Sequence, residues 1–293
     1  MLISIITINY KKKDLTITCL KSLQNQFKNE FLQNQMEIVI VDNCSKDDSV
    51  ESIKDFINKN DYKNAIVIES FENGGFGKGN NLGVKSAKGE FLVFLNNDTT
   101  AEDNGILKMA KYLKEHNEIS ILGGQLRNTD GSIQVSVGSF YSLGKSIFLL
   151  LGMQRFGIID KNPKVIKGVD WVKGGLFMIR KEVFESLKGF DENIFMYTED
   201  MELCYRAKLK GYKTFFYPNV EVLHAEHGST SRTFAVVNIY KNLLYFYKKH
   251  KSFLEYLILK TILITKAVLL IIVGKLIGSS YLFKTYKEAL RSI

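Results

Sequence analysis

The segment Leu95-Asn96-Asn97-Asp98 joins one carboxylate and two amides to the end of a short apolar run, residues 91–95. An apolar run of this length predicts a buried strand, so the polar residues should lie at its carboxyl end. In open α/β sheets this end is where ligands bind. Carboxylate and amide oxygens can hold Mg²⁺ or Mn²⁺ and still leave positions for phosphate oxygens. We therefore expect a divalent cation near Asp98, although a polar turn after a strand would have the same composition.

Polar side chains end the first two apolar runs in the same way. Thr7-Ile8-Asn9-Tyr10 closes the first run, and Asp42-Asn43 closes the second. An Asp beside an Asn offers the acceptors and donors that a pyrimidine base requires. Capping of the helix that follows each strand is the other interpretation of these residues.

A glycine-rich stretch, residues 72–81, follows the third apolar run. Glycines let the backbone approach a diphosphate, and the free N–H groups at the start of the next helix, expected over residues 80–87, favour anions. Lys78 would add a positive charge. The pattern Gly75-x-Gly77 is not a dinucleotide fingerprint, because that motif follows the first strand and needs a third glycine at another spacing.

Two adjacent acids, Glu199 and Asp200, stand at the start of a helix expected over residues 200–210 and ended by Gly211. The helix dipole favours acids at this end, so simple capping explains them. An acid in a cleft could instead accept a proton from a sugar hydroxyl.

A histidine, His224, follows a short apolar run, and hydroxyl and guanidinium groups come soon after it. The histidine could complete a metal site, while Ser229, Thr230 and Arg232 could hold phosphate. A structural histidine is the alternative.

Strands and helices alternate along the first half of the chain, which predicts a largely parallel sheet with right-handed crossovers. The expected strands are residues 2–8, 37–41, 65–68, 91–95 and 119–122, and the expected helices include residues 15–27 and 106–113. Later strands are expected at residues 169–172, 176–179 and 212–217, the last of them ended by Pro218.

The order of these motifs resembles the inverting nucleotide-sugar glycosyltransferases of family 2, and among them the rhamnosyltransferase-like branch, over about residues 1–250. The matching strings are Thr7-Ile8-Asn9-Tyr10, Asp42-Asn43, Asn73-Gly74-Gly75-Phe76-Gly77, Leu95-Asn96-Asn97-Asp98, Gly174-Gly175, Gly189-Phe190-Asp191-Glu192, Glu199-Asp200, His224 with Ser229-Thr230, and Tyr245-Phe246-Tyr247-Lys248-Lys249-His250. The resemblance implies an α/β GT-A fold, in which a mostly parallel Rossmann-like sheet flanked by helices binds a nucleotide sugar.

The resemblance also implies a role for individual residues. Asp98 matches the metal-binding acid of the family's D-x-D element, in which Asn96 replaces the first acid, and His224 or His227 would be the second ligand of Mg²⁺ or Mn²⁺. Asp200 matches the catalytic base. Acceptor-side or supporting residues would be Glu199, Gly174, Gly175 and Trp171. The nucleotide sugar would lie against Thr7, Asn9, Tyr10, Asp42, Asn43, Asn73, Gly75, Phe76, Lys78, Asn80, Asn96, Asn97, Ser229 and Arg232.

The expected activity is inverting transfer of a sugar to a hydroxyl of a glycan or lipid-linked acceptor in cell-surface polysaccharide synthesis. The first donor expected from the resemblance is dTDP-rhamnose, followed by UDP-sugars. A sugar-phosphate nucleotidyltransferase is the first alternative, but it would carry a glycine-rich basic loop after the first strand, where this chain has no glycine over residues 9–13. An inactive glycan-binding protein is the second, and the presence of Asp98 and Asp200 argues against it.

The chain of 293 residues has a formal charge of +9, and its lysines are scattered. No compact basic motif is interleaved with aromatics, which argues against nucleic acid as a partner. We expect a catalytic domain over residues 1–235 and a helical segment over residues 236–293. The start of the chain has no basic leader, so the catalytic part should face the cytoplasm.

The apolar tail, residues 253–283, is interrupted by Glu255, Lys260, Lys266 and Lys275. Charges inside a bilayer are costly, so we expect helices lying in the cytoplasmic membrane interface, with lysines toward lipid phosphates. A spanning helix is one alternative, and an arm packed on the domain or on a second copy in a homodimer is another.

Overall fold

The computed structural model describes residues 2–62, 64–150, 160–225 and 231–293. The chain divides into two compact units. The sheet unit comprises Met1–Ser139, Asn162–Phe195 and Glu199–His227, and the helical unit comprises Phe140–Lys161, Met196–Thr198 and Gly228–Ile293.

The described segments contain the following elements. The strands are β1 (Ile3–Asn9), β2 (Met36–Asp42), β3 (Ala65–Glu69), β4 (Phe91–Leu95), β5 (Thr99–Ala101), β6 (Ile119–Arg127), β7 (Val137–Gly138), β8 (Lys167–Gly168), β9 (Trp171–Val172), β10 (Leu176–Arg180) and β11 (Lys213–His224). The helices are α1 (Lys13–Leu32), α2 (Ser49–Lys59), α3 (Gly75–Val84), α4 (Gly105–Glu115), α5 (Leu143–Leu150), α6 (Lys181–Ser186), α7 (Glu199–Leu209), α8 (Arg232–His250), α9 (Phe253–Leu276) and α10 (Ser280–Arg291).

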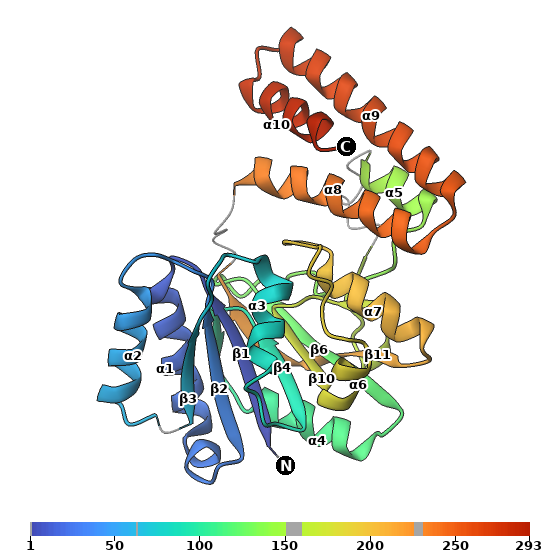
Figure 1. Ribbon diagram of the computed structural model, residues 1–293. Coiled ribbons are helices and arrows are strands. Elements are labelled where there is room, and N and C mark those ends of the chain that lie inside the picture. Colours follow the sequence, from blue (N-terminus) through green and yellow to red (C-terminus); the bar gives the residue numbers. More distant parts are fainter. Residues whose placement is uncertain (1, 63, 151–159, 226–230) are drawn as a thin grey trace. The chain divides into compact units, whose positions relative to one another are not determined.

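The sheet unit is built on one mixed sheet with the strand order β3-β2-β1-β4-β10-β6-β11-β5, and β8 adds to β11 (Figure 1). Strands β3, β2, β1 and β4 are parallel neighbours, β10 runs antiparallel to both β4 and β6, and β11 is parallel to β6. The mostly parallel sheet expected from the sequence is therefore confirmed. Since β6 and β11 run in the same direction as β4, the carboxyl ends of these strands share one edge of the sheet.

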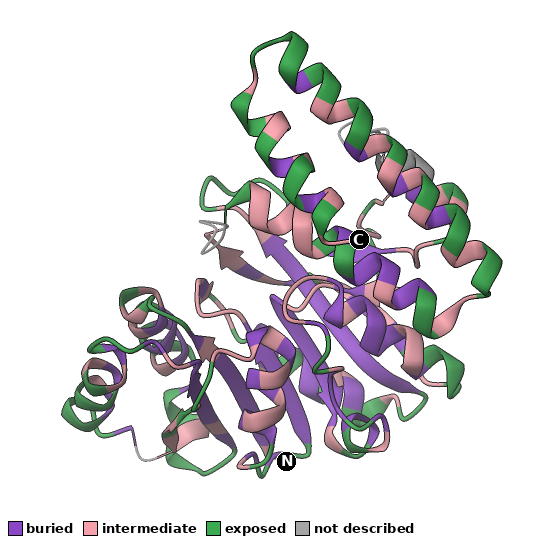
Figure 2. Cartoon of the chain, turned by 45° about the horizontal axis from the view of Figure 1, so that its top comes forward, coloured by how far each residue is buried: buried purple, intermediate pink, exposed green. Residues whose placement is uncertain are grey.

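Apolar side chains cover both faces of the sheet. On one face, Ile3 and Ile5 of β1 join a core cluster with the buried side chains of α1, α2 and α4. On the other, Ile6 packs against α3, which crosses β1 and β2 (Figure 1). Figure 2 shows the central strands almost wholly buried, as expected for strands covered on both faces. Each isoleucine buried in this way contributes about 1.5–3 kcal/mol.

An aromatic cluster fixes the loop that precedes α7. The rings of Phe94, Phe184 and Phe190 lie with centroids 4.9–5.4 Å apart. The side-chain amide of Asn81 accepts a hydrogen bond from the Phe190 N–H and donates one to the Phe190 carbonyl oxygen, both at 2.9 Å. The Gly189-Phe190-Asp191-Glu192 string is thus attached to α3 by its backbone and to the sheet by its ring.

Several boundaries expected from the sequence are wrong. The strand expected at residues 169–172 is reduced to β9, because residues 169 and 170 separate it from β8. Helix α3 begins at Gly75 rather than Asn80, because the Phe76 N–H bonds the Phe195 carbonyl oxygen (2.9 Å), so tertiary contact stabilises a glycine-rich first turn. Strand β11 continues past Pro218, since its register to β6 shifts between Tyr217 and Glu221. A proline is tolerated at such an irregularity because no ladder hydrogen bond is needed from it.

The helical unit is held together by contacts among α8, α9 and α10. Tyr240 of α8 packs on Tyr286 of α10, with ring centroids 6.2 Å apart. Ser252 and Glu255 form a reciprocal capping box at the start of α9. Helix α8 begins at Arg232, so the domain boundary expected at residue 235 falls inside this helix.

Candidate active site

The ends of β4 and β11 bring Asp98 and His224 together. Residues 96–98 follow β4, and His224 is the last residue of β11, where it pairs with Thr99 of β5. The Ala225 N–H donates to the Asp98 carbonyl oxygen (3.0 Å). His224 Nε2 lies 3.3 Å from Asp98 Oδ1 and 3.1 Å from Asn96 Nδ2. Asp98 and His224 are the two side chains expected to hold the cation. They are separated by over a hundred residues in sequence, and they lie together at the carboxyl edge of the sheet.

This pair fits a divalent cation. An octahedral cation with ligands at about 2.1 Å places adjacent ligand atoms about 3.0 Å apart, close to the observed separation of Nε2 and Oδ1. The side chains of Asp98 and His224 are 16% and 13% exposed, so they are mostly buried but still accessible to solvent. Within the described ranges, no group of three or more His, Cys, Asp or Glu side chains could hold a metal. Two protein ligands leave positions for phosphate oxygens.

Hydrogen bonds connect the ends of β1 and β2 with the segment after β4. Asn9 Nδ2 donates to Asp42 Oδ1 (2.6 Å), and Asn9 Oδ1 accepts from the Thr16 hydroxyl (2.9 Å). Asn97 Nδ2 donates to that same hydroxyl (3.0 Å). The Ser45 N–H (2.8 Å) and hydroxyl (2.5 Å) donate to the Asp42 carboxylate. The side chains of Asn9 and Asp42 are buried, and their hydrogen bonds connect the carboxyl ends of β1 and β2.

Buried oxygen atoms without partners lie in the same region. Thr7 Oγ1, Asn43 Oδ1 and Asn80 Oδ1 accept no hydrogen bond from any described residue. Asn43 donates through Nδ2 to the Gly75 carbonyl oxygen (2.9 Å), which aims its amide at α3. A Cβ on Gly79 would lie 2.8 Å from Asn43 Oδ1, so glycine is required for this close approach. A buried acceptor without a donor costs free energy that a bound ligand could recover.

The glycine-rich segment is ordered by its own contacts. Gly75 has φ +80°, and a Cβ there would lie 1.8 Å from the Phe195 carbonyl oxygen, so only glycine fits. Asn73 Oδ1 accepts from the Gly75 N–H (3.1 Å). The ammonium of Lys78 pairs with Glu72 at 2.5 Å and is largely exposed. The segment therefore forms a fixed first turn of α3 next to the end of β2.

Asp200 lies on the first turn of α7 and is linked to the end of β4. Its Oδ2 accepts from the Gly174 N–H (3.0 Å), and its Oδ1 accepts from the Met201 N–H (2.7 Å). The next residue, Gly175, accepts through its carbonyl oxygen from the Asn96 N–H (3.3 Å). Gly174, Gly175 and Asn96 thus connect Asp200 with the strand end that carries Asp98. The two acids occupy the same edge of one sheet.

The two adjacent acids, Glu199 and Asp200, have different hydrogen-bonding surroundings. Burial raises the pKa of Glu199 to about 8, and the neighbouring Asp200 charge adds to the shift. Glu199 Oε2 finds no hydrogen-bond partner among the described residues. Burial also raises the pKa of Asp200, but the Met201 and Gly174 N–H groups and the charge of Lys173 oppose this effect. The two N–H groups stabilise the charged form of Asp200, whereas Glu199 Oε2 has no such donor among the described residues.

Helix α7 is anchored by a buried ion pair. Arg206 Nε lies 2.8 Å from the carboxylate of Glu202, which has no exposed surface. Arg206 Nη2 also donates to the Gly189 carbonyl oxygen (2.8 Å). These bonds tie the helix that carries Asp200 to the loop held by the aromatic cluster.

Sequence comparison identifies the family. A model described as "Glycosyl transferase family 2" matches residues 4–187, which is more than half of the chain. The chain belongs to glycosyl transferase family 2. A second model, "N-terminal domain of galactosyltransferase", matches residues 158–228. The family resemblance inferred from the motifs is confirmed.

Curated relatives of this family 2 chain include rhamnosyltransferases. Rhamnosyltransferase WbbL of Escherichia coli (strain K12) is 28% identical over 162 residues, covering 52% of this chain and 61% of that protein. The N-acetylglucosaminyl-diphospho-decaprenol L-rhamnosyltransferase of Mycobacterium tuberculosis (strain ATCC 25618 / H37Rv) is 31% identical over 123 residues, covering 38% and 39%. The chain thus spans about three-fifths or less of the length of these relatives.

Solved structures place the family 2 chain in the GT-A fold. A mannosyltransferase of Pyrobaculum calidifontis, solved with GDP-Man and Mn²⁺, has a TM-score of 0.62 and 15% identity, and the match covers 99% of this chain and 74% of that one. The expected fold class is confirmed.

The remaining residues expected at the family 2 site make the following contacts. Trp171 donates its indole N–H to the Ser139 carbonyl oxygen (3.1 Å) and packs on Gly138. Tyr10 directly follows β1 and is 39% exposed. Arg232 begins α8 in the helical unit. Ser229 and the alternative histidine, His227, lie outside the described residues, so their roles stay predictions.

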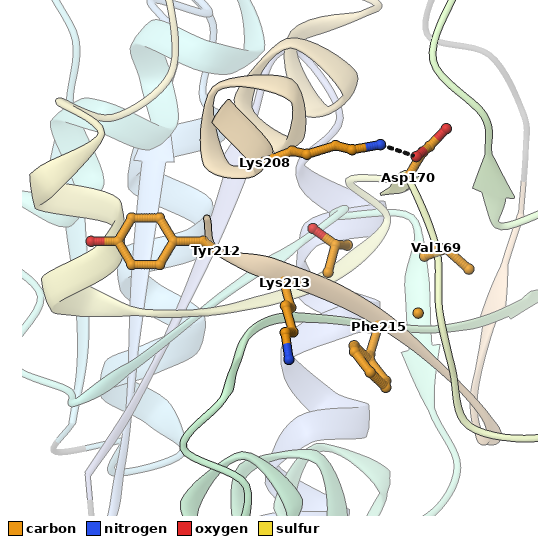
Figure 3. A pocket seen from close by; sticks show the side chains of 8 residues that line it. Val169, Asp170, Lys208, Tyr212, Lys213 and Phe215 are labelled. Atoms are coloured by element: carbon orange, nitrogen blue, oxygen red, sulfur yellow. Dashed lines mark hydrogen bonds and ion pairs between the residues drawn. The ribbon is translucent and has the colours of Figure 1, made fainter. Parts of the chain in front are cut away.

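A cavity of about 500 Å³ lies in the sheet unit, and none of its lining residues is expected at the family 2 site. It is lined by the start of β11, the end of α7 and the segment between β8 and β9. Figure 3 shows Lys208 reaching Asp170 (3.0 Å), while Tyr212 points away from that pair. Because Lys213 starts its strand, this hollow lies at the amino end of β11, opposite the edge that holds His224.

Three residues that shape the family 2 site were not expected from the sequence. Thr16 and Ser45 bond the amide and carboxylate of Asn9 and Asp42. Gln134 accepts a hydrogen bond from His224. Ser45 could have been found from its position three residues after Asp42, where a carboxylate can accept a local bond from a backbone N–H. Gln134 has no local signal, because its partner is 90 residues away.

Proposed function

We propose that this chain transfers a glycosyl group from a nucleoside-diphosphate sugar to a hydroxyl of a glycan or lipid-linked glycan, with inversion at the anomeric carbon. The observation that carries the proposal is the shared sheet edge. It holds an Asp98–His224 pair suited to a divalent cation and, through Asn96 and the two glycines at residues 174–175, an acid on a helix start.

On the donor side, Asp98 and His224 would hold Mg²⁺ or Mn²⁺. The bound cation would neutralise charge on the departing nucleoside diphosphate. Asn43 and Asn80 offer unpartnered oxygens to donor groups of the nucleotide. Asn9 and Asp42 keep the ends of β1 and β2 in register so that this surface is preformed.

On the acceptor side, Asp200 would take the proton of the attacking hydroxyl. The oxygen forms a bond to the anomeric carbon from the face opposite the leaving group, and the bond from that carbon to the phosphate oxygen breaks with its electrons. One displacement inverts the configuration without a covalent sugar–enzyme intermediate. Glu199, neutral below about pH 8, keeps a second negative charge away from the base.

The rhamnosyltransferase names among the relatives support dTDP-rhamnose as the first donor, with UDP-sugars next. The name of the Mycobacterium tuberculosis relative supports an acceptor carried on a polyprenyl diphosphate. Transfer onto such an acceptor would take place in the assembly of a cell-surface polysaccharide.

The proposal includes attachment to the cytoplasmic face of a membrane through α9. This helix has 24 residues, and its apolar stretch has a mean hydropathy of 2.3, so it is long and apolar enough by composition to cross a membrane. Its buried positions Leu259, Leu263 and Ala267 recur every four residues, and the remaining surface is mostly apolar. Lys260, Lys266 and Lys275 interrupt that surface, which favours a helix lying among anionic headgroups over one spanning the bilayer.

The transfer reaction is tested by screening nucleotide sugars for thermal stabilisation of the full chain with Mn²⁺ or Mg²⁺. The stabilising donor is then supplied with a polyprenyl-diphosphate-linked N-acetylglucosamine, and the product is analysed by NMR for its anomeric configuration. Release of nucleoside diphosphate with an inverted product is the expected result. Release of pyrophosphate from a sugar phosphate and NTP would establish nucleotidyl transfer instead.

Membrane attachment is tested by flotation with vesicles that contain phosphatidylglycerol. The unmodified chain should float, and Leu269→Gln with Ile272→Gln should reduce flotation because both side chains are exposed on α9. The control is Leu209→Gln, an equally exposed leucine at the end of α7. The contrary result has two parts: the unmodified chain does not float, and it forms a dimer in size-exclusion chromatography that the α9 substitutions dissociate. This result would identify a second copy of the chain as the partner of the exposed face of α9.

A further inference from the structure

His224 meets a different partner at each ring nitrogen. Nδ1 lies 2.9 Å from Oε1 of Gln134, and Nε2 lies 3.1 Å from Nδ2 of Asn96. A neutral imidazole has one N–H donor and one acceptor, so these partners decide which nitrogen carries the proton.

The amide of Gln134 has only one satisfactory orientation. Its Nε2 donates to Asn128 Oδ1 (2.6 Å) and to the His224 carbonyl oxygen (3.0 Å). If the amide were turned over, its oxygen would face these two acceptors without a proton between them. Oε1 must therefore face the ring, and Nδ1 of His224 carries the proton. The lone pair of Nε2 then points toward the Asn96 amide and the carboxylate of Asp98.

Gln134 is itself held firmly in place. Its N–H donates to the Leu126 carbonyl oxygen (2.9 Å), and its carbonyl oxygen accepts from the side-chain amides of Gln125 (2.9 Å) and Asn162 (2.8 Å). Gln134 is 5% exposed, whereas its apolar neighbours Ile133 and Val135 are 62% and 42% exposed. Burial of Ile133 or Val135 would be favoured by their apolar side chains, yet the structure buries the amide of Gln134 instead. The hydrogen bonds of Gln134 therefore determine the conformation of this segment.

We infer that Gln134 is a positioning residue that fixes the tautomer and ring orientation of His224, so that Nε2 is offered as a metal ligand. The inference rests on the proposed function, because it takes His224 as a ligand of the cation. Outer partners of a metal-binding histidine typically change metal affinity by about 10- to 100-fold when they are lost. Gln134→Leu, which keeps a similar volume and loses the acceptor, should weaken Mn²⁺ binding by this factor.

The experiment has two readouts on the full chain. Long-range ¹H–¹⁵N correlation of the imidazoles reports which nitrogen is protonated, and His224→Gln assigns the signal. The unmodified protein should show the Nδ1–H form, and Gln134→Leu should lose it. Mn²⁺ alone, titrated by calorimetry, reports affinity. Gln33→Leu, at an exposed glutamine after α1, is the matched control and should change neither readout.

The outcomes separate this inference from the proposed function. An Nε2–H signal for His224 in the unmodified protein overturns the inference and leaves the transferase proposal standing. The Nδ1–H form with Mn²⁺ affinity unchanged in Gln134→Leu would also overturn the inference, because the partner of Nδ1 would then have no effect on the metal site. Mn²⁺ affinity unchanged in His224→Gln would overturn the metal site itself. Since the first readout needs no variant, the test does not depend on Gln134→Leu folding. Gln134→Glu, which keeps an acceptor at Nδ1, should retain the Nδ1–H form.

Discussion

Replacement of Asp200 by asparagine is the most direct test of the proposed chemistry. The substitution removes the proton acceptor and keeps the volume. Loss of a general base typically slows a reaction by about 10²- to 10⁴-fold. At about 1.36 kcal/mol per tenfold change, this raises the barrier by about 2.7–5.4 kcal/mol. The affinity for the donor should remain within a few-fold, because the donor lies on the Asp98 side of the site.

The structure shows that Asp200→Asn also has a local cost. The two carboxylate oxygens accept from the Gly174 and Met201 N–H groups. An asparagine has one oxygen, so its NH₂ group must face one of these donors. A mispaired group of this kind costs about 1–3 kcal/mol. Urea denaturation should therefore show a variant that is folded but less stable than the unmodified protein.

The assay combines release of nucleoside diphosphate in the presence of acceptor with donor binding by calorimetry. Asp55→Asn, at an exposed aspartate of α2, is the matched control and should leave both measurements unchanged. If Asp200→Asn binds the donor and transfers sugar as fast as the unmodified protein, Asp200 is not the base and the mechanism is wrong.

Three further predictions follow from the described contacts. Asp98→Ala should abolish the gain in nucleotide affinity that Mn²⁺ provides, measured by calorimetry; equal affinity with and without Mn²⁺ in the unmodified protein would contradict the metal role. Glu199 should make the free energy of unfolding fall as the pH rises from about 4.5 to about 8, because over this range the folded chain holds a proton that the unfolded chain has released. Glu199→Gln should flatten that slope in urea denaturation, and an unchanged slope would show that Glu199 is ionised. Asn242→Leu should destabilise the helical unit by about 1–3 kcal/mol, since the buried amide donates to the carbonyl oxygens of Met196 (2.8 Å) and Tyr197 (2.9 Å). In thermal unfolding, Asn238→Leu, which loses only a bond to a carbonyl of its own helix, should cost less.

The positions of the polar strand ends could be predicted from the sequence. The buried runs that precede Asn9, Asp42 and Asp98 are mostly apolar, which is the local pattern of a parallel strand covered on both faces. Once strands alternate with helices, their carboxyl ends must share an edge. The sequence therefore indicated which side chains would gather before any contact was known.

The contacts between those side chains could not be predicted in the same way. The sequence suggested Asp42 for a nucleotide base, but in the structure its carboxylate accepts bonds from Ser45 and Asn9. Helix α3 starts early because of a carbonyl at Phe195, which is far along the chain. Gln134 reaches His224 across 90 residues. Each of these depends on the packing of distant segments, and no local propensity carries that information.

The irregularity around Pro218 controls the direction in which His224 points. Tyr217 of β11 is opposite Gly124 of β6, and Glu221 is opposite Gln125, so three additional residues are accommodated while the partner strand advances by one. Side chains of a strand alternate between its faces, so an odd change in length exchanges the two sides. Removal of one residue between Tyr217 and Glu221 would turn the imidazole to the reverse side of β11, whereas removal of two would preserve its side. The face of β11 that presents the histidine is thus set by an irregularity whose residues are not among those expected at the site.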